Sequence, residues 1–397
     1  RSVFIMNYIP YGSHSVDYKD LKNILKIKKK NIYTNGYFLT EFEKRTKKYL
    51  GSRYSIAVNS GTSAIHLAFK AINLKKGDNI IMPAVNFVAA YSTAKLCGAN
   101  IFFADIDYKT GQMSPKNILE CKKKNKIKKV KAFITMYLAG SPEFINDFYL
   151  LKKKLKCYFL EDACHAFGSS YKIKNKIYKL GSCKHADIST FSFHPVKTIT
   201  TGEGGLITTN NLKFFNKIKE QRSHGIIRNL PKHWKYKINE TSLNYRLSEI
   251  NCILGISQLK KINSFLKKRF LLSKIYRKNF YSIKNLIEPI YTENSSLSAW
   301  HLYIVFINFN KLKINKDKFI QRLKNDKIIV QQHYIPLYKV LNMKGKMHKS
   351  FPNSERYFKN ALSLPLFNDL SFEKQKYVIN KIKKILDYAK IKKRTKK

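Results

Sequence analysis

One lysine of this chain stands apart from the others by its neighbours. Lys197 lies in the run Phe191-Ser-Phe-His-Pro-Val-Lys-Thr-Ile-Thr-Thr-Gly-Glu-Gly-Gly205, among serine, histidine, threonine and glycine. An ordinary exposed lysine has a pKa of about 10.4 and is almost wholly protonated at neutral pH. Burial and nearby positive charge lower that pKa and make the amine nucleophilic. The run therefore predicts an end-of-strand loop that holds one reactive amine in a fixed place.

The glycines that follow this lysine are expected to leave room for a bulky ligand above the loop. They form the segment Gly202-Glu203-Gly204-Gly205, and residues 206–209 read as a returning strand. A hairpin loop with an incidental lysine is the simplest alternative, and the length of the whole run argues against it.

Two further segments could bind a cofactor beside such an amine. An apolar stretch at 157–160 ends in Glu161 and Asp162, and His165 follows in a small-residue loop. A carboxylate at the C-terminal end of a strand lies where open α/β sheets bind ligands, although Asp162 alone also fits a helix cap. Gly61, Thr62 and Ser63 open a helical pattern after an apolar strand. A helix N-terminus of this kind is an anion site, or simply a capped helix.

Together these segments resemble the DegT/DnrJ/EryC1/StrS family of sugar aminotransferases, which use pyridoxal 5'-phosphate. In that family the Ser-Phe-His-x-x-Lys-x-Ile-Thr-x-x-Glu-Gly-Gly run carries the lysine that binds the cofactor as a Schiff base, so the resemblance implies this role for Lys197. It implies that Asp162 keeps the pyridine nitrogen protonated, so that the ring withdraws electrons. His165 matches a family histidine that packs close to the ring.

The resemblance extends to the phosphate and to a second subunit. It implies a phosphate site made of Gly61, Thr62, Ser63 and Ser192. Phe87 matches an aromatic residue that stacks on the pyridine, and Asn244 matches one that reaches the phosphate of the neighbouring subunit. A homodimer with shared active sites is therefore expected. Without the family, Phe87 also fits a core position and Asn244 a turn.

The expected reaction moves an amino group from L-glutamate to C4 of a UDP-linked 4-keto-6-deoxy-N-acetylhexosamine. Residues 222–225, 244–247 and 332–336 look like the branch of the family that makes pseudaminic acid precursors. Residues 299–303 and 363–367 also resemble the branch that aminates a UDP-4-keto-pentose for lipid A modification.

Three residues are candidates for the substrate side of the site. They are His333, His301 and Glu203, and a structural role fits each histidine equally well. Enzymes of the related sugar 3-dehydrase branch carry histidine where Lys197 stands, which argues against that reaction.

The composition is that of a globular protein with an unusual charge. The chain has 397 residues, 44% of them apolar, and a formal net charge of +52. Such a charge raises the possibility of a basic nucleic-acid-binding or regulatory protein that kept the fold. However, the lysines are scattered, and only 11 of the 77 basic residues are arginine. Drift toward AT-rich codons explains the bias better, so nucleic acid is an unlikely partner.

The cysteines and the apolar runs bear on location. None of the six cysteines forms a Cys-x-x-Cys pair, so no metal site is predicted and reduced thiols in a cytoplasmic protein are expected. No run of about 18 apolar residues is present, and no secretory signal is recognised. Residues 1–5 are interpreted as an extension upstream of Met6.

Short apolar strands alternate with helical patterns in the first half of the chain. Strands are predicted at 55–59, 79–82, 100–104, 131–136, 157–160, 187–191 and 206–209. Helices are predicted at 62–72, 87–97 and 145–155. This alternation indicates an α/β fold with a mainly parallel seven-stranded sheet, and the resemblance implies fold type I, the aspartate aminotransferase fold.

The remaining segments are assigned to an arm and to a smaller domain. Residues 1–50 read as a helical arm and 247–272 as a long amphipathic helix. A smaller C-terminal α+β domain is expected, with strands at 300–308 and 328–332. The predicted division places the arm and the large cofactor-binding domain in 1–262, and a linker helix and the small domain in 263–397.

Overall fold

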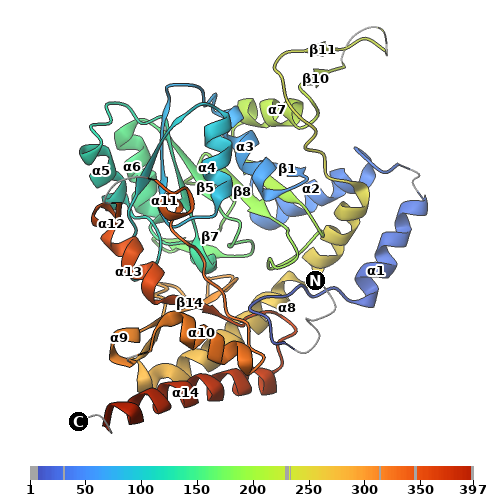
Figure 1. Ribbon diagram of the computed structural model, residues 1–397. Helices are drawn as coiled ribbons and strands as arrows, with labels where there is room; N and C mark the ends of the chain where they lie inside the picture. The colour runs from blue at the N-terminus through green and yellow to red at the C-terminus, as the bar shows by residue number, and fades with distance from the viewer. Residues whose placement is uncertain are drawn as a thin grey trace.

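A large sheet and a small sheet, each covered by helices, make up the fold (Figure 1). The computed structural model describes residues 8–29, 32–228, 232, 234–312, 314–343 and 347–394. The extension predicted at residues 1–5 lies outside this range. None of the described helices combines the length and the apolar composition that crossing a membrane requires.

The large sheet has seven strands in the order β1-β9-β8-β5-β4-β2-β3. Their bounds are β1 (Tyr54–Val58), β2 (Asn79–Pro83), β3 (Asn100–Ala104), β4 (Ala132–Met136), β5 (Tyr158–Asp162), β8 (Ile188–Ser192) and β9 (Gly205–Thr209). Only β9 runs against its neighbours, pairing antiparallel with both β1 and β8. The mainly parallel seven-stranded sheet predicted from the sequence is therefore confirmed.

Helices cover both faces of this sheet, so its strands are buried almost throughout. One face packs against α3 (Gly61–Ala71), α4 (Val88–Leu96) and α7 (Leu212–Gln221). The opposite face carries α5 (Pro115–Lys124) and α6 (Ile145–Leu155). Neighbouring residues of β2 face opposite sides of the sheet, because Ile80 packs with the first set of helices and Ile81 with the second. The three helices predicted in this region are confirmed to within one residue at each end.

One long helix, α8 (Glu249–Phe280), connects the parts of the molecule. Its first half contacts the arm helices α1 (Tyr18–Ile24) and α2 (Tyr37–Leu50) (Figure 1). Its second half contacts strand β12 (Ile287–Pro289) and helix α14 (Phe372–Arg394). The helix predicted at 247–272 is thus present and continues for two further turns. The predicted division between residues 262 and 263 falls inside α8 and stays a prediction.

The small sheet contains three antiparallel strands, β12 (Ile287–Pro289), β13 (Tyr303–Ile307) and β14 (Ala361–Leu364). Together with α8, α10 (Lys316–Asn325) and α14 (Phe372–Arg394), they enclose a separate apolar core. The strand predicted at 328–332 is wrong. That segment forms only isolated bridges, one from Ile328 to Ile9 and one from Gln331 to Ser363. It pairs with a different segment at each end, so no continuous ladder forms.

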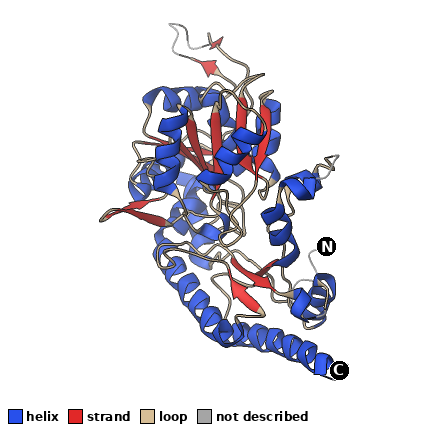
Figure 2. Cartoon of the chain, turned by 90° about the vertical axis from the view of Figure 1, so that its left-hand side faces the viewer, coloured by secondary structure: helices blue, strands red, loops and turns tan. Residues whose placement is uncertain are grey.

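Short elements complete the chain. Two hairpins, β6 (Ser170–Ile173) with β7 (Lys176–Lys179) and β10 (Ile226–Ile227) with β11 (Lys237–Ile238), project from the body (Figure 2). The remaining helices are η1 (Leu25–Lys29), η2 (Leu138–Gly140), η3 (Tyr281–Ile283), α9 (Phe309–Leu312), α11 (Leu337–Val340), α12 (Met347–Ser350) and α13 (Pro352–Asn360).

The start of α2 is capped by a carboxylate from another helix. Glu249, the buried first residue of α8, accepts hydrogen bonds from the N–H groups of Gly36 (2.9 Å), Phe38 (2.7 Å) and Leu39 (3.1 Å). These N–H groups have no acceptor within the helix, and the helix dipole favours a negative charge beside them. Glu249 therefore fastens the arm to α8.

Replacing this carboxylate should weaken the whole molecule. Glu249→Ala removes the acceptor of three N–H groups, and we expect the free energy of unfolding to fall by about 2 kcal/mol. The measurement is the urea midpoint. Glu41→Ala, which removes only a surface pair with Arg45 on α2 (2.6 Å), is the control and should cost less than about 0.5 kcal/mol. Equal losses in the two variants would contradict the capping role.

Candidate active site

The segments singled out in the sequence meet at one edge of the large sheet. Because β9 is antiparallel to both neighbours, β1 runs in the same direction as β8 and β5. Their C-terminal ends therefore share an edge, which is where open α/β sheets bind ligands. Asp162 ends β5, Ser192 ends β8, and α3 begins just after β1.

A cavity of about 690 Å³ opens at this edge. The predicted site residues that line it are Gly61, Thr62, Phe87, Asp162, His165, Ser192, Lys197, Glu203, His301 and His333. Two predicted residues lie elsewhere. Ser63 is buried, with its hydroxyl donating to Asn59 Oδ1 (2.6 Å), and Asn244 is exposed and does not line the cavity of its own chain.

The loop that carries Lys197 is closed by its own backbone. The carbonyl of Phe193 accepts from the Thr200 hydroxyl (2.9 Å) and from the Thr201 N–H (3.1 Å), and the Lys197 N–H donates to the His194 carbonyl (2.9 Å). Burial lowers the pKa of Lys197 below that of an ordinary lysine, against the opposing effect of Cys164 and Asp162. The amine is therefore more easily neutral and nucleophilic than the many surface lysines.

The glycines of this loop serve a different purpose from the one predicted. A Cβ at Gly205 would lie 2.2 Å from the Ser60 carbonyl oxygen, and one at Gly204 would lie 2.2 Å from Thr201 Oγ1. The space above them is filled by the protein itself, so the prediction of room for a ligand is wrong for these two glycines. Instead Gly205 lets β9 lie against the turn between β1 and α3, and Gly204 lets the Lys197 loop fold closely onto its own residue Thr201.

Asp162 is a buried carboxylate facing this cavity. It accepts a hydrogen bond from the Cys164 N–H (3.1 Å). Burial raises the pKa of Asp162, while the Cys164 hydrogen bonds and the charge of Lys197 lower it. A cationic N–H placed against Asp162 would stabilise its charged form.

The N-terminus of α3 offers an anion site at the same edge. Ser60 is the N-cap, and its side chain accepts from the Ser63 N–H (3.0 Å). The N–H groups of Gly61 and Thr62 belong to the first turn, which has no acceptor within the helix. A Cβ at Gly61 would lie 2.8 Å from the Cβ of Ser192, so only glycine allows this close approach.

Three buried histidines form another wall. The rings of His165 and His301 lie 4.3 Å apart, and His165 Nε2 bonds the Tyr334 hydroxyl (2.9 Å). His333 Nδ1 bonds the Ser363 hydroxyl (2.8 Å). Burial lowers all three pKa values, that of His333 to about 3, and the charge of Lys197 adds to the effect. The histidines are therefore neutral at physiological pH.

Several lining residues escaped the sequence analysis. They are Tyr11, Ser60, Asn86, Cys164, His194 and Tyr334. Ser60, Cys164, His194 and Tyr334 lie within or directly beside the runs that indicated the site, so the sequence carried a signal for them. Tyr11 could not, because long-range contacts bring it there: its carbonyl accepts from the Leu366 N–H (3.0 Å), and its ring lies 5.1 Å from that of His333.

Comparison with known proteins agrees with this geometry. The profile of the DegT/DnrJ/EryC1/StrS aminotransferase family matches residues 14–383. This chain belongs to that family. It is therefore a sugar aminotransferase that depends on pyridoxal phosphate, and the predicted fold type I is confirmed.

Individual relatives span almost the whole chain. The UDP-4-amino-4,6-dideoxy-N-acetyl-beta-L-altrosamine transaminase of Campylobacter jejuni is 33% identical over 383 residues, covering 96% of this chain and 98% of the relative. Helicobacter pylori PseC, an aminotransferase involved in the biosynthesis of pseudoaminic acid, superposes with a TM-score of 0.85 at 26% identity, over 96% of this chain and 100% of PseC. A Streptococcus pneumoniae protein solved in its PLP form shares the fold, with a TM-score of 0.84 at 24% identity over 96% and 99% of the chains.

The cavity of this family member suits the cofactor chemically. It combines one lysine of lowered pKa, one buried carboxylate and a helix N-terminus cleared of side chain by Gly61. A buried ring nitrogen, His165 Nδ1, has no hydrogen-bond partner within the described residues. An aldehyde, a pyridine nitrogen and a phosphate could each find a complementary group here.

The neutral histidines predict a loss of stability in acid. Their pKa values are depressed in the folded state, whereas an unfolded histidine titrates near 6.5. As the pH falls below about 6.5, these histidines bind protons in the unfolded chain but not in the folded chain. Stability should therefore fall by about 1.4 kcal/mol per pH unit for each histidine.

Unfolding midpoints of the cofactor-free protein between pH 7 and pH 5 test this. In His333→Asn the amide can keep the bond to Ser363, and the slope with pH should be smaller than in the wild type. His14→Asn changes an exposed histidine and should leave the slope unaltered. Identical slopes for His333→Asn and the wild type would contradict the interpretation.

Proposed function

We propose that this enzyme transfers an amino group from L-glutamate to C4 of a UDP-linked 4-keto-6-deoxy-N-acetylhexosamine, a step toward pseudaminic acid. The observation that carries the proposal is the 33% identity, over nearly the full length, to a transaminase named for the amino sugar of that reaction. Residues 332–335, part of the segment 332–336 that resembles this branch, line the cavity beside the other site residues.

We assign the cofactor roles from the cavity. When bound, pyridoxal phosphate supplies an aldehyde that joins an amine and a ring that withdraws electrons from the neighbouring carbon. Lys197 would bind the aldehyde of the cofactor, and Asp162 would keep its ring nitrogen protonated. The first turn of α3, with Thr62 and Ser192, would hold the phosphate, and Phe87, 51% exposed at the cavity, would contact the ring.

In the reaction, Lys197 also moves the proton. Its lowered pKa would let the free amine accept the proton from Cα of the amino donor and later give a proton up again. The three histidines of the wall are neutral, so no imidazolium cation lies beside this amine. Burial is therefore the main influence on the pKa of Lys197. His301, His333 and Glu203 lie where the sugar would enter.

We further propose a homodimer in which Asn244 serves the partner's phosphate site. Asn244 is exposed, and Asn59 Nδ2 donates to its carbonyl (3.1 Å), which fixes the backbone while leaving the residue at the surface. The neighbouring β10–β11 hairpin stands away from the body (Figures 1 and 2). It and the following segment expose Trp234, Tyr236, Ile238 and Leu243. A partner subunit would cover this apolar surface, and a monomeric mass for the active enzyme in light scattering would refute the arrangement.

The role of Lys197 can be tested chemically. Borohydride reduction of the holoenzyme should fix the pyridoxyl group on Lys197, because no other lysine lines the cavity among the described residues. Peptide mapping locates the label, and Lys197→Ala should carry none. Lys179→Ala, which removes another partly buried lysine whose pKa is lowered by burial, is the matched control and should be labelled as the wild type is. A label on a different lysine would refute the assignment.

The substrate proposal predicts discrimination on the C2 acetamido group. A site built to bond an amide rejects analogues that lack it. We therefore expect kcat/KM for the UDP-linked 4-keto-N-acetylhexosamine to exceed that for a UDP-4-keto-pentose by about tenfold or more. Both are measured with the same glutamate and salt, because the charge of the chain attracts any nucleotide diphosphate. A preference for the pentose would refute the proposed sugar substrate but would not contradict the aminotransferase activity.

A further inference from the structure

A row of residues on α8 holds the backbone of the Lys197 loop. Asn251 Nδ2 donates to the carbonyl of Glu203 (3.2 Å) and also to that of Thr201. Gly255, one turn later, allows close approach, since a Cβ there would lie 2.8 Å from Thr201 Cγ2. One turn further on, Gln258 Oε1 accepts a long hydrogen bond from the Thr200 N–H (3.5 Å). The loop thus rests on one face of α8.

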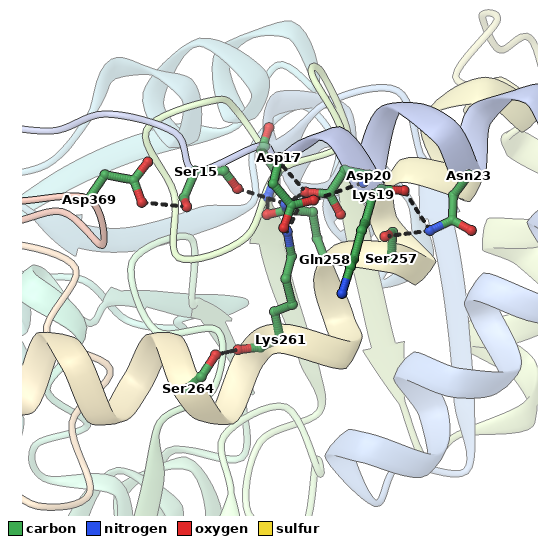
Figure 3. Close-up of polar contacts among 11 residues, drawn as sticks. Ser15, Asp17, Lys19, Asp20, Asn23, Ser257, Gln258, Lys261, Ser264 and Asp369 are labelled. Carbon is green, nitrogen blue, oxygen red and sulfur yellow. Dashed lines mark hydrogen bonds and ion pairs between the residues drawn. The ribbon is translucent and has the colours of Figure 1, made fainter.

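The other end of the Gln258 amide faces the N-terminal arm. Its Nε2 donates to the carbonyl of Ser15 (2.8 Å) and to Asp20 Oδ2 (2.7 Å) (Figure 3). Asp20 is completely buried, and Lys261 donates to the same carboxylate oxygen. Gln258 is itself 1% exposed. One buried amide therefore contacts the arm and the Lys197 loop at the same time.

The arm determines which way this amide points. Its oxygen and nitrogen are nearly equal in size, so shape alone does not select an orientation. Asp20 and Ser15 both present acceptors, which requires the NH₂ group to face the arm. The carbonyl oxygen is then left for the Thr200 N–H. The reverse orientation would set donor against donor and acceptor against acceptor in a buried place.

The same arm also enters the cavity. Tyr11, seven residues before α1, lines it, and a Cβ at Gly12 would lie 3.8 Å from the Cβ of Val196 in the Lys197 loop. The Ser15 hydroxyl donates to Asp369 (2.7 Å), which ties the arm to the small domain (Figure 3). The arm therefore lies close to the loop at Gly12 and is connected to it through Gln258 at another point.

We propose that Gln258 is a positioning residue that couples docking of the arm, through Asp20, to the loop that presents Lys197 to the cofactor. With the arm docked, the oriented amide holds the Thr200 backbone, and the loop is fixed for cofactor binding. The inference rests on the proposed role of Lys197, which the borohydride experiment on the wild-type protein tests separately.

The test measures binding of pyridoxal phosphate to the cofactor-free full-length protein. Asp20→Asn can present either a donor or an acceptor to Gln258, and Gln258→Leu removes the bond to Thr200. Each should raise the dissociation constant about tenfold, or about 1.4 kcal/mol. Each should also shift the pH midpoint of the visible absorbance of the bound cofactor, because that band reports the surroundings of the lysine linkage.

A double variant and a control make the result decisive. If Asp20 acts through Gln258, adding Asp20→Asn to Gln258→Leu should change the dissociation constant no further. Asn23→Ala removes another bond between arm and α8, to Ser257 (3.1 Å), without contacting the loop, and should leave binding unchanged (Figure 3). Additive effects, an equal effect of Asn23→Ala, or a lower melting temperature with unaltered binding and pH midpoint would overturn the proposal. Should Gln258→Leu fail to fold, the comparison of Asp20→Asn with Asn23→Ala decides.

Discussion

The reversal of a single strand determines where the chemistry of this enzyme can take place. Because β9 runs antiparallel between β8 and β1, the C-terminal ends of β1, β5 and β8 meet at one edge. This brings the anion site before α3 to the edge that Asp162 and the loop after Ser192 already share, because β5 and β8 pair in parallel. Gly205 makes the arrangement possible, since any side chain there would push β9 away from the turn that follows β1.

Burial then sets the charge of the site. In water, a lysine surrounded by histidines would repel their protonated forms, and a protein with a net charge of +52 adds to that repulsion. Within the cavity, burial instead favours the neutral forms of Lys197, His165, His301 and His333. Cys164 and the buried carboxylate of Asp162 oppose this effect at Lys197, since both raise its pKa. The chemistry therefore depends on how tightly the surrounding elements exclude water.

Much of this site could be predicted because its residues lie in contiguous runs. Lys197 and Gly61 follow short buried strands and Asp162 ends another, and the chain order of strands and helices indicates the sheet. Tyr11, which enters the site through long-range contacts, was missed. The segment 328–332 has the composition of a strand, yet it pairs with Ile9 at one end and Ser363 at the other. The role of Gly204 and Gly205 was misjudged because the sequence does not show which atoms crowd them. Those at Gly205 belong to Ser60, far away in the sequence, and those at Gly204 to Thr201 of the same loop.

Acidic side chains are scarce in this protein, 25 against 77 basic ones, and several of them occupy buried positions with several partners each. Glu249 caps α2, Asp20 orients Gln258, and Glu43 binds both Arg222 (2.6 Å) and the Ala57 N–H (2.9 Å). Arg222, which resembled a substrate-branch residue in the sequence, thus supports the arm helix α2 against β1.

A lysine on the surface can be gained or lost at little cost, since an exposed charge contributes little to stability. A buried carboxylate that accepts several hydrogen bonds cannot, because its removal leaves each donor without a partner. The excess of positive charge therefore describes the surface of this enzyme, whereas its few buried carboxylates determine how the arm, α8 and the Lys197 loop are held together.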